Sequence, residues 1–425
     1  MSEGSIRTNL RQKIVCPHCW YEFSPDETLW VAEHPDLEDD VQLVDQPQRF
    51  LPNRFDPVGR AIDAGNVSCE ELACPQCHLI VPRALFEIVP FFASIVGTVS
   101  CGKTYFLTAM TWKLRRLLPQ RFELLFADTD LNSNKKLKEY ERLLFYNPES
   151  DLPIKLRKTE INPMGAPDLY NQVKIDNRPV TFPRPFFFVI RPQDSHPNSH
   201  SIARHARAIC LYDNAGEHFE PGADTQRTPV TRHLARSRVV FMLFDPTQDP
   251  NMRAACRPDA TDPQIVHGPV TLRQDLVLHE VVDRIRRDTG LGLSERHNRP
   301  LIVVLTKFDA WCHLLKVKEL REPYKQSKSG LFVLDLAYIE KVSEAIKKLL
   351  WKYCPDFVAS AQGFAENVTY IPVSATGCAP GYDPLTEEVL GMRPSDINPM
   401  WVEVPLLYTL ARFEGNLIGY ARSGN

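Results

Sequence analysis

Residues 97–104 read GTVSCGKT and fit the pattern G-x-x-x-x-G-K-[ST], which wraps backbone N–H groups around a phosphate chain. Gly97 and Gly102 let the backbone close on the phosphates, and Lys103 is expected to reach the β- and γ-phosphates. The hydroxyl of Thr104 is expected to bind Mg²⁺. The pattern alone does not say which base the nucleotide carries. The predicted phosphate-binding residues are Gly97, Thr98, Val99, Ser100, Cys101, Gly102, Lys103, Thr104 and Tyr105.

The segments on either side of this loop have the pattern that a phosphate loop needs. Residues 91–96 (FFASIV) form a short apolar run typical of a buried parallel strand. Residues 104–119 carry apolar side chains at helical spacing, and Pro119 is expected to end the helix. A strand before the loop and a helix after it favour a functional phosphate loop over a chance match.

A second acidic element follows the apolar run ARAICLYD, where Asp213 and Gly216 form the arrangement D-x-x-G. A carboxylate at this strand end could complete the Mg²⁺ shell beside the phosphate loop, and the Gly216 N–H could bind the γ-phosphate. Asp followed by Gly is also common in ordinary turns. The position of the pair in the chain order favours the metal-binding interpretation.

Two later apolar runs, PLIVVLTKFDA and VTYIPVSATG, end in residues that could read a base. TKFD resembles the [NT]-K-x-D element of GTPases, in which the Asp accepts from the guanine N1–H and amine while the Lys stem lies over the ring. Adenine offers no such pair of donors at that edge. SAT resembles the accompanying S-A-x element, whose backbone N–H at Ala375 would meet the guanine oxygen. The predicted base-binding residues are Thr306, Lys307, Asp309, Ser374, Ala375 and Thr376.

Two C-P-x-C pairs stand nearer the N-terminus, CPHC at 16–19 and CPQC at 74–77. Two such turns can supply the four thiolates of a tetrahedral structural zinc site. The separation exceeds the usual spacing of a zinc ribbon, so the polar stretch between the pairs is predicted to be a looped insertion. Two unrelated turns or a redox pair are the alternatives. The predicted zinc ligands are Cys16, Cys19, Cys74 and Cys77, with Cys69, His18 and His78 as less favoured substitutes.

The nucleotide motifs stand in the order found in P-loop GTPases of the translation-factor-related (TRAFAC) class, and the resemblance covers roughly residues 90–425. The zinc-ribbon front, the long insertions and the form YDNAGE are similar to double-GTPase proteins of bacterial conflict systems. The resemblance implies a Mg²⁺-dependent protein that binds GTP and GDP. It also implies a protein partner, such as a second GTPase or an effector.

The chain departs from the family pattern where the attacking water is expected. Small GTPases carry Gln directly after D-x-x-G, whereas this chain has Glu217 and then His218. Either residue could orient water or act as a base, or simply be a surface charge. Val99 stands where small GTPases often have Gly, which would obstruct an arginine supplied from outside. Hydrolysis is therefore expected to be slow without a partner.

The switch threonine, which would complete the Mg²⁺ shell in the triphosphate state, should lie between the loop helix and Asp213. Thr159 is preferred because it lies in an irregular polar segment, although an ordinary loop role fits it equally well. Thr129 follows a strand and fits a turn better. The residues predicted to act in hydrolysis are Lys103, Glu217, His218 and Thr159, and the predicted Mg²⁺ ligands are Thr104, Asp213 and Thr159.

The composition limits the function classes. The 425 residues carry a formal net charge of -3, so there is no general attraction to nucleic acid or an anionic membrane. The most apolar stretch is too short to span a bilayer. Eleven scattered cysteines, several inside apolar runs, favour a reducing cytoplasm over a disulfide framework. We therefore expect a cytoplasmic protein with no membrane partner, and nucleic acid is not favoured as a partner.

Strands and helices alternate after residue 90, which predicts an α/β fold with a doubly wound, mainly parallel sheet. One antiparallel pair is expected, between FFFVIRP and ARAICLYD. The predicted domains are a zinc ribbon with a looped insertion at 1–88 and a P-loop GTPase domain at 89–425, with insertions near 130–180 and 246–298. Two helices are expected to cover the sheet: one after residue 270 with Leu276 on its apolar side, and one capped by Asp335.

The leading hypothesis is a GTP-binding switch that acts on a protein partner. A GTP-binding scaffold that does not hydrolyse its nucleotide is a second hypothesis. A zinc-ribbon nucleic-acid-binding protein with a vestigial nucleotide fold is a third, and the net charge argues against it.

Overall fold

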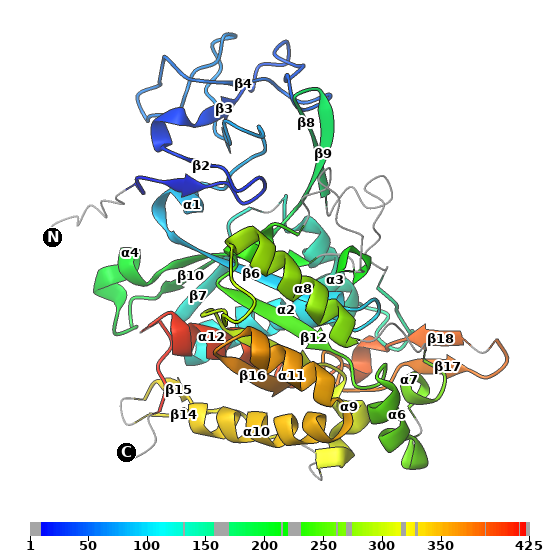
Figure 1. Ribbon diagram of the computed structural model, residues 1–425. Coiled ribbons are helices and arrows are strands. Elements are labelled where there is room, and N and C mark those ends of the chain that lie inside the picture. Colours follow the sequence, from blue (N-terminus) through cyan, green and yellow to red (C-terminus); the bar gives the residue numbers. More distant parts are fainter. Residues whose placement is uncertain are drawn as a thin grey trace.

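A seven-stranded sheet with the order β16-β13-β12-β6-β11-β10-β7 forms the centre of the protein (Figure 1). The structure is a computed structural model that describes residues 10–130, 132–156, 170–213, 216–219, 231–260, 262–268, 274–315, 320–327, 330–386, 388–415 and 417–421, with the backbone alone at Glu217 and Asp259. The strands are β6 (Val89–Gly97), β7 (Leu124–Asp128), β10 (Phe186–Pro192), β11 (Arg207–Asp213), β12 (Val239–Phe244), β13 (Leu301–Leu305) and β16 (Val368–Pro372).

The sheet is mainly parallel, as the sequence predicts. β6 pairs in parallel with β11 and β12, and the parallel pairing continues through β13 to β16. β10 runs antiparallel to both β11 and β7. The sequence predicts a single antiparallel pair; two occur because the reversed strand lies between two neighbours and opposes both. The antiparallel pairing of β10 with β11 is confirmed.

Successive side chains of a strand point to opposite faces of the sheet, and this decides which of the two buried clusters each side chain joins. On β11, Cys210 and Tyr212 pack in the cluster that contains the N-terminal part of the chain. Ile209 and Leu211 pack in the main core, together with residues of α2 (Lys103–Arg121). Because successive side chains of a strand point to opposite faces, Asp213 shares a face with Leu211.

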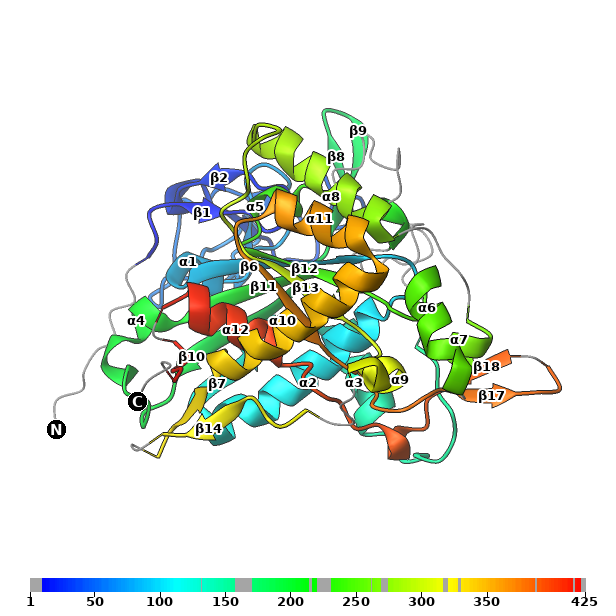
Figure 2. The same ribbon diagram turned by 60° about the horizontal axis from the view of Figure 1, so that its bottom comes forward.

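Helices cover the sheet and hold it in the middle of the fold (Figure 2). They include α3 (Lys135–Phe145), α8 (Gln274–Thr289), α10 (Leu336–Tyr353), α11 (Pro355–Phe364) and α12 (Val404–Phe413). The prediction for α10 is confirmed: the Asp335 carboxylate accepts the N–H of Tyr338 at the start of the helix. Among the described helices, none has the length and apolarity needed to cross a bilayer.

Two details of the helix predictions are wrong. Pro119 lies inside α2, which continues to Arg121, because a proline so close to the end removes a single N–H bond from the last turn. Leu276 is 39% exposed. The buried side of α8 is instead formed by Val277, Leu278, Val281, Val282 and Ile285, whose spacing of three and four residues gives one continuous stripe.

The N-terminal part lies against one face of the sheet, with the hairpin of β8 (Tyr170–Ile175) and β9 (Arg178–Pro183) beside it (Figure 1). Trp20 shares a buried cluster with Phe92 of β6 and Tyr212 of β11. This part contains β1 (Ile14–Val15), β2 (Glu22–Phe23), β3 (Leu29–Val31), β4 (Arg49–Phe50) and β5 (Leu72–Ala73). The stretch predicted as a looped insertion contains β4, and turns make up much of the rest. The domain boundaries stay predictions.

Candidate nucleotide and metal sites

The phosphate loop joins the end of β6 to the start of α2, as the sequence predicts. Gly102 has φ +94°, in the left-handed region that glycine tolerates best. Gly97 lies against β12, where a Cβ would come within 2.8 Å of the Leu243 carbonyl oxygen. Both glycines are therefore required by the backbone path of the loop. Cys101 is buried, and burial raises the pKa of its thiol, so it packs as a small apolar side chain.

Lys103 lies under the loop rather than in solvent. Its Nζ donates to the carbonyl oxygens of Gly97 at 3.0 Å and Thr98 at 2.8 Å, and the side chain is buried. A buried ammonium held by two carbonyl dipoles keeps a positive charge inside the turn of the loop. The helix start adds positive potential at the same place. This arrangement can bind an anion such as a phosphate.

The D-x-x-G segment meets the loop at two points. Thr104 Oγ1 donates to Asp213 Oδ2 at 3.1 Å. Gly216 lies so close that a Cβ there would come within 2.5 Å of the backbone nitrogen of Val99. Asp213 is buried, its Oδ1 has no hydrogen-bond partner among the described residues, and burial raises its pKa to about 6. A hydroxyl beside a buried carboxylate oxygen matches the oxygen ligands that Mg²⁺ takes. Thr159 lies outside the described residues.

The two predicted base-reading segments lie together at the ends of β13 and β16. The hydroxyl of Ser374 donates to Asp309 Oδ1, and it accepts the N–H of Gly377 at 2.7 Å. Burial raises the pKa of Asp309 to about 6. Lys307 has φ +55°, and it precedes the short helix α9 (Phe308–Trp311). The segments after β13 and β16 are thus joined, and the Asp309 carboxylate is held in a fixed orientation by Ser374.

A third segment, residues 245–248 after β12, was not found by sequence reasoning. Asp245 is fully buried and lies 2.6 Å from Lys307 Nζ. Gln248 accepts from Thr98 Oγ1 at 3.0 Å and donates to the Val99 carbonyl oxygen at 3.1 Å. This segment therefore joins the phosphate loop to Lys307, the lysine predicted to lie over the base. The sequence feature that could have identified this segment is its position: residues 245–248 directly follow the apolar strand β12, which is parallel to β6.

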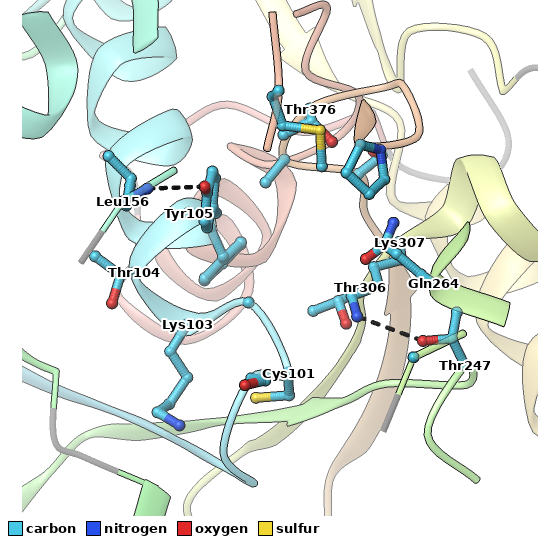
Figure 3. Close-up of a pocket in the computed structure, with 18 of the residues that line it drawn as sticks. Cys101, Lys103, Thr104, Tyr105, Leu156, Thr247, Gln264, Thr306, Lys307 and Thr376 are labelled. Atoms are coloured by element: carbon cyan, nitrogen blue, oxygen red, sulfur yellow. Dashed lines mark hydrogen bonds between the residues drawn. The ribbon is translucent and has the colours of Figure 1, made fainter. Parts of the chain in front are cut away.

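One cavity of about 470 Å³ runs along the phosphate loop and the two base-reading segments (Figure 3). That volume falls within the range of small-molecule and cofactor pockets. Predicted residues that line it are Val99, Ser100, Cys101, Gly102, Lys103, Thr104, Tyr105, Gly216, Thr306, Lys307, Ser374, Ala375 and Thr376. Gly97, Thr98, Asp213 and Asp309 support these lining residues through the contacts above.

The wall of the cavity includes a hairpin that the sequence analysis did not identify. β17 (Gly381–Asp383) pairs with β18 (Glu388–Gly391), and both figures of the whole chain show this hairpin at the side of the molecule (Figures 1 and 2). Ile154 and Met392 exchange backbone hydrogen bonds of 2.8 and 2.9 Å, and the hydroxyl of Tyr105 accepts the N–H of Leu156 at 3.0 Å. The chain before residue 157 is therefore held on the cavity wall (Figure 3).

His218 does not line the cavity. Its Nε2 is hydrogen-bonded to the hydroxyl of Tyr170 at 2.9 Å, and the two rings lie edge to face with centroids 5.5 Å apart. Its carbonyl oxygen accepts from Arg284 at 2.7 Å. The side chain of Glu217 lies outside the described part of the structure. The structure thus places His218 against the β8–β9 hairpin.

The four predicted zinc ligands form one cluster, in which all four Sγ atoms lie within 4.8 Å of one another. Cys16 and Cys77 are 3.7 Å apart, and so are Cys19 and Cys74. The donor set of four thiols in this space fits tetrahedral Zn²⁺. All eleven cysteines are free.

The two C-P-x-C turns have the same backbone geometry. The Cys16 N–H donates to the Tyr21 carbonyl and the Cys74 N–H to the Leu79 carbonyl, at 2.9 and 3.0 Å. The next residue after each pair has positive φ, 67° at Trp20 and 61° at His78. A repeated turn of this kind supports a common metal site over two unrelated turns.

The substitute ligands lie elsewhere. His18 Nε2 is 3.1 Å from the Ile80 carbonyl oxygen, and His78 Nδ1 is 2.8 Å from Asp40. Cys69 lies beside Asp63. Among the described residues, the metal-ligand cluster therefore consists of the four cysteines alone.

Comparisons with known proteins do not assign a family. No model of a known protein family matches the chain, and no curated protein matches it. Among solved structures, the chain is similar to translation elongation factor SelB from Methanococcus maripaludis in complex with the GTP analogue GppNHp, with 12% sequence identity and a TM-score of 0.22. The similarity covers 68% of this chain and 30% of that chain. A likeness this low carries no argument about function.

We expect the purified protein to hold about one zinc ion per chain, since the four thiols form a closed tetrahedral set. Cys74→Ser should lose most of this zinc, because serine does not supply a thiolate. Elemental analysis of the purified proteins measures both. Cys69→Ser is the matched control, since Cys69 is a buried cysteine of the same region outside the cluster. Zinc retained in full by Cys74→Ser, or absent from the wild type, contradicts the assignment.

Proposed function

We propose that the chain is a guanine-nucleotide-binding protein that works as a Mg²⁺-dependent switch on a protein partner. The observation that carries the proposal is the single cavity lined by the phosphate loop, the segment after β13 and the segment after β16. The phosphates would lie on residues 97–104, beside the buried ammonium of Lys103. The base would lie against the segments that contain Lys307 and Ala375.

The preference for guanine is argued from Asp309. Its carboxylate is fixed through Ser374, which is itself held by the N–H of Gly377. An ionised carboxylate has acceptor sites for two donors, and guanine presents an N–H and an amine on one edge. Adenine lacks this pair of donors, so it would add no hydrogen bond to a carboxylate that has Ser374 as its donor. The fixed orientation supports selection at this position.

The switch is argued from the contact between the D-x-x-G segment and the phosphate loop. Thr104 and Asp213 would hold the Mg²⁺, with Thr159 as the proposed third protein ligand. When bound, Mg²⁺ would neutralise charge on the phosphates. Gly216 lies against Val99, so the presence or loss of a γ-phosphate next to the loop would change the position of the segment that follows.

Slow hydrolysis is argued from the position of His218. Its ring is directed to Tyr170 and does not line the cavity, so Glu217 is the remaining candidate of the pair for orienting water. We therefore propose that a partner completes the catalytic site. The partner could be a second GTPase or an effector.

The proposal also includes a family for the chain. The order of the motifs supports the TRAFAC class, and the four-cysteine cluster in front of the nucleotide fold supports a likeness to double-GTPase proteins of bacterial conflict systems. A cytoplasmic location is supported by the free state of every cysteine.

We expect the protein to bind GTP more tightly than ATP, and Asp309→Asn to reduce this preference by roughly 10²- to 10⁴-fold, the loss of two hydrogen bonds to a charged group. Competition binding with both nucleotides measures it. Asp194→Asn is the matched control, an exposed aspartate beyond β10 at the opposite edge of the sheet. Equal affinity for GTP and ATP in the wild type would overturn the guanine assignment.

The pKa of about 6 at Asp309 gives the guanine preference a pH dependence. The pKa is raised, so the carboxylate that binds guanine is present above about pH 6 and becomes protonated below it. We expect GDP affinity to fall about tenfold per pH unit below the pKa, and ADP affinity to change little. The titration is made without added Mg²⁺ and without a chelator, so that Mg²⁺ does not contribute and the cysteine cluster keeps its metal. Asp309→Asn should remove the difference between the nucleotides, and an unchanged GDP profile in that variant would contradict the assignment.

We expect single-turnover GTP hydrolysis at about 10⁻⁴ to 10⁻² s⁻¹, the range of GTPases without an external activator. Thr104→Ala should reduce phosphate release further, because the hydroxyl next to Asp213 is lost, while GDP still binds without added Mg²⁺. Thr108→Ala, one turn further along α2, is the control. Tight GTP binding with no phosphate release at all would instead favour the scaffold hypothesis.

A further inference from the structure

The first cysteine turn of the zinc cluster is seated directly on β11. The hydroxyl of Tyr212 donates to the carbonyl oxygen of Pro17 at 2.6 Å. Trp20 packs its ring against Tyr212 and Phe92, with centroid distances of 5.4 and 5.2 Å. Tyr212 is fully buried, so this hydrogen bond is shielded from water. The cluster is therefore in contact with the central sheet through a side chain of fixed position.

Tyr212 is the residue before Asp213, and the two side chains leave the strand on opposite faces. Tyr212 meets the cysteine turn on one face, while Asp213 accepts from Thr104 on the other. The ring of Tyr212 also stacks on His233, with centroids 4.6 Å apart and an interplanar angle of 4°. His233 is hydrogen-bonded to Ser94 of β6 at 2.5 Å. The end of β11 is thus fixed from two sides.

A second route leads from the same cysteine turn to the other end of the D-x-x-G segment. The Nδ1 of His18 lies 3.5 Å from the Asn171 side-chain nitrogen on β8. The preceding residue, Tyr170, is hydrogen-bonded to His218 at 2.9 Å. The turn at residues 16–19 therefore contacts Tyr212, the neighbour of Asp213, and Asn171, the neighbour of the Tyr170 that is bonded to His218. Described contacts from one turn to both ends of a segment can transmit a change in either direction.

We propose that Tyr212 is a positioning residue that couples the four-cysteine metal site to the Mg²⁺-nucleotide site, so that each site changes the affinity of the other. The proposal rests on the proposed function, since it needs a nucleotide on the phosphate loop. Coupling between sites is reciprocal by thermodynamic necessity. Asp213 would take on a further restraint when Mg²⁺ and a triphosphate are bound, and the adjacent Tyr212 would pass that restraint to Pro17 and the cysteine turn. Metal release from the cysteines is then slower in the triphosphate state.

The experiment measures zinc transfer from the full-length protein to a chromogenic chelator, in the presence of EDTA-free buffer alone, Mg²⁺ with GDP, or Mg²⁺ with a non-hydrolysable GTP analogue. Nucleotide binding is measured in the same samples with fluorescent nucleotides. We expect the GTP analogue to slow zinc release at least fivefold in the wild type, the lower end of typical coupling between sites. In Tyr212→Phe, the effect of nucleotide on zinc release should be much smaller than in the wild type, because the bond to Pro17 is lost while the ring and the contacts of His18 and Tyr170 remain.

Two controls separate coupling from packing. Tyr370→Phe removes the hydroxyl of another buried sheet tyrosine, one that bonds to Gln362 on α11 and not to the metal site, and it should keep the full nucleotide effect. Trp20→Phe changes the packing beside Tyr212 but keeps the hydroxyl bond, and it should also keep the effect. The reciprocal measurement is the affinity for the GTP analogue with and without zinc on the four cysteines, and this difference should be smaller in Tyr212→Phe than in Tyr370→Phe.

The outcomes are distinct. Nucleotide binding with zinc release that is the same in all three states overturns the coupling and leaves the proposed function standing. A full nucleotide effect in Tyr212→Phe overturns the role of this residue. Absence of any guanine-nucleotide binding overturns the proposed function and the coupling together. If Tyr212→Phe does not fold, the comparison of nucleotide states in the wild type still decides whether the sites are coupled.

Discussion

Parallel pairing of five strands is the constraint on which the candidate site depends. Parallel strands end at the same edge of a sheet, so the loops that follow β6, β11, β12, β13 and β16 meet although they are far apart in the sequence. Each loop brings one kind of group: a glycine-rich turn, a carboxylate, a polar linker, a lysine with an aspartate, and a serine. Any change of register would separate them, because shifting a strand by one residue also reverses its faces.

Buried charge is the second feature that organises this edge. Asp245 is fully buried and is held beside Lys307, while Gln248 from the same segment bonds to the phosphate loop. A buried pair of this kind contributes little net stability, since desolvation opposes the attraction, but losing one partner is costly. Its effect is to fix the relative position of the two ends of the cavity. The raised pKa values of Asp213 and Asp309 have the same main cause, since burial disfavours the charged form of each carboxyl group.

The sequence predicted most groups that face the cavity, because each stands at a strand end within a short pattern of fixed spacing. It predicted the α/β class, the parallel sheet, the cap of α10 and the grouping of four cysteines in one cluster for the same local reasons. Asp245 and Gln248 were missed because no short pattern marks them, and their role follows from the strand order. The prediction for Leu276 is wrong because the buried stripe of α8 runs through Val277 and Leu278, which leaves Leu276 at its margin. The place of the β17–β18 hairpin on the cavity wall was also not predicted, because it depends on tertiary contacts that no short sequence pattern marks.

The four-cysteine cluster was predicted from spacing, but its place on the sheet was not. A zinc site alone could sit on a flexible arm, whereas here Trp20 and Tyr212 join it to the core. Strand alternation then has a consequence that no motif contains. Neighbouring side chains on β11 face opposite layers. Tyr212 therefore points away from the face that holds Asp213, and it contacts the turn at residues 16–19 that carries two of the four cysteines. One peptide unit thus joins Tyr212, which contacts the cysteine turn, to Asp213, which contacts Thr104 of the phosphate loop.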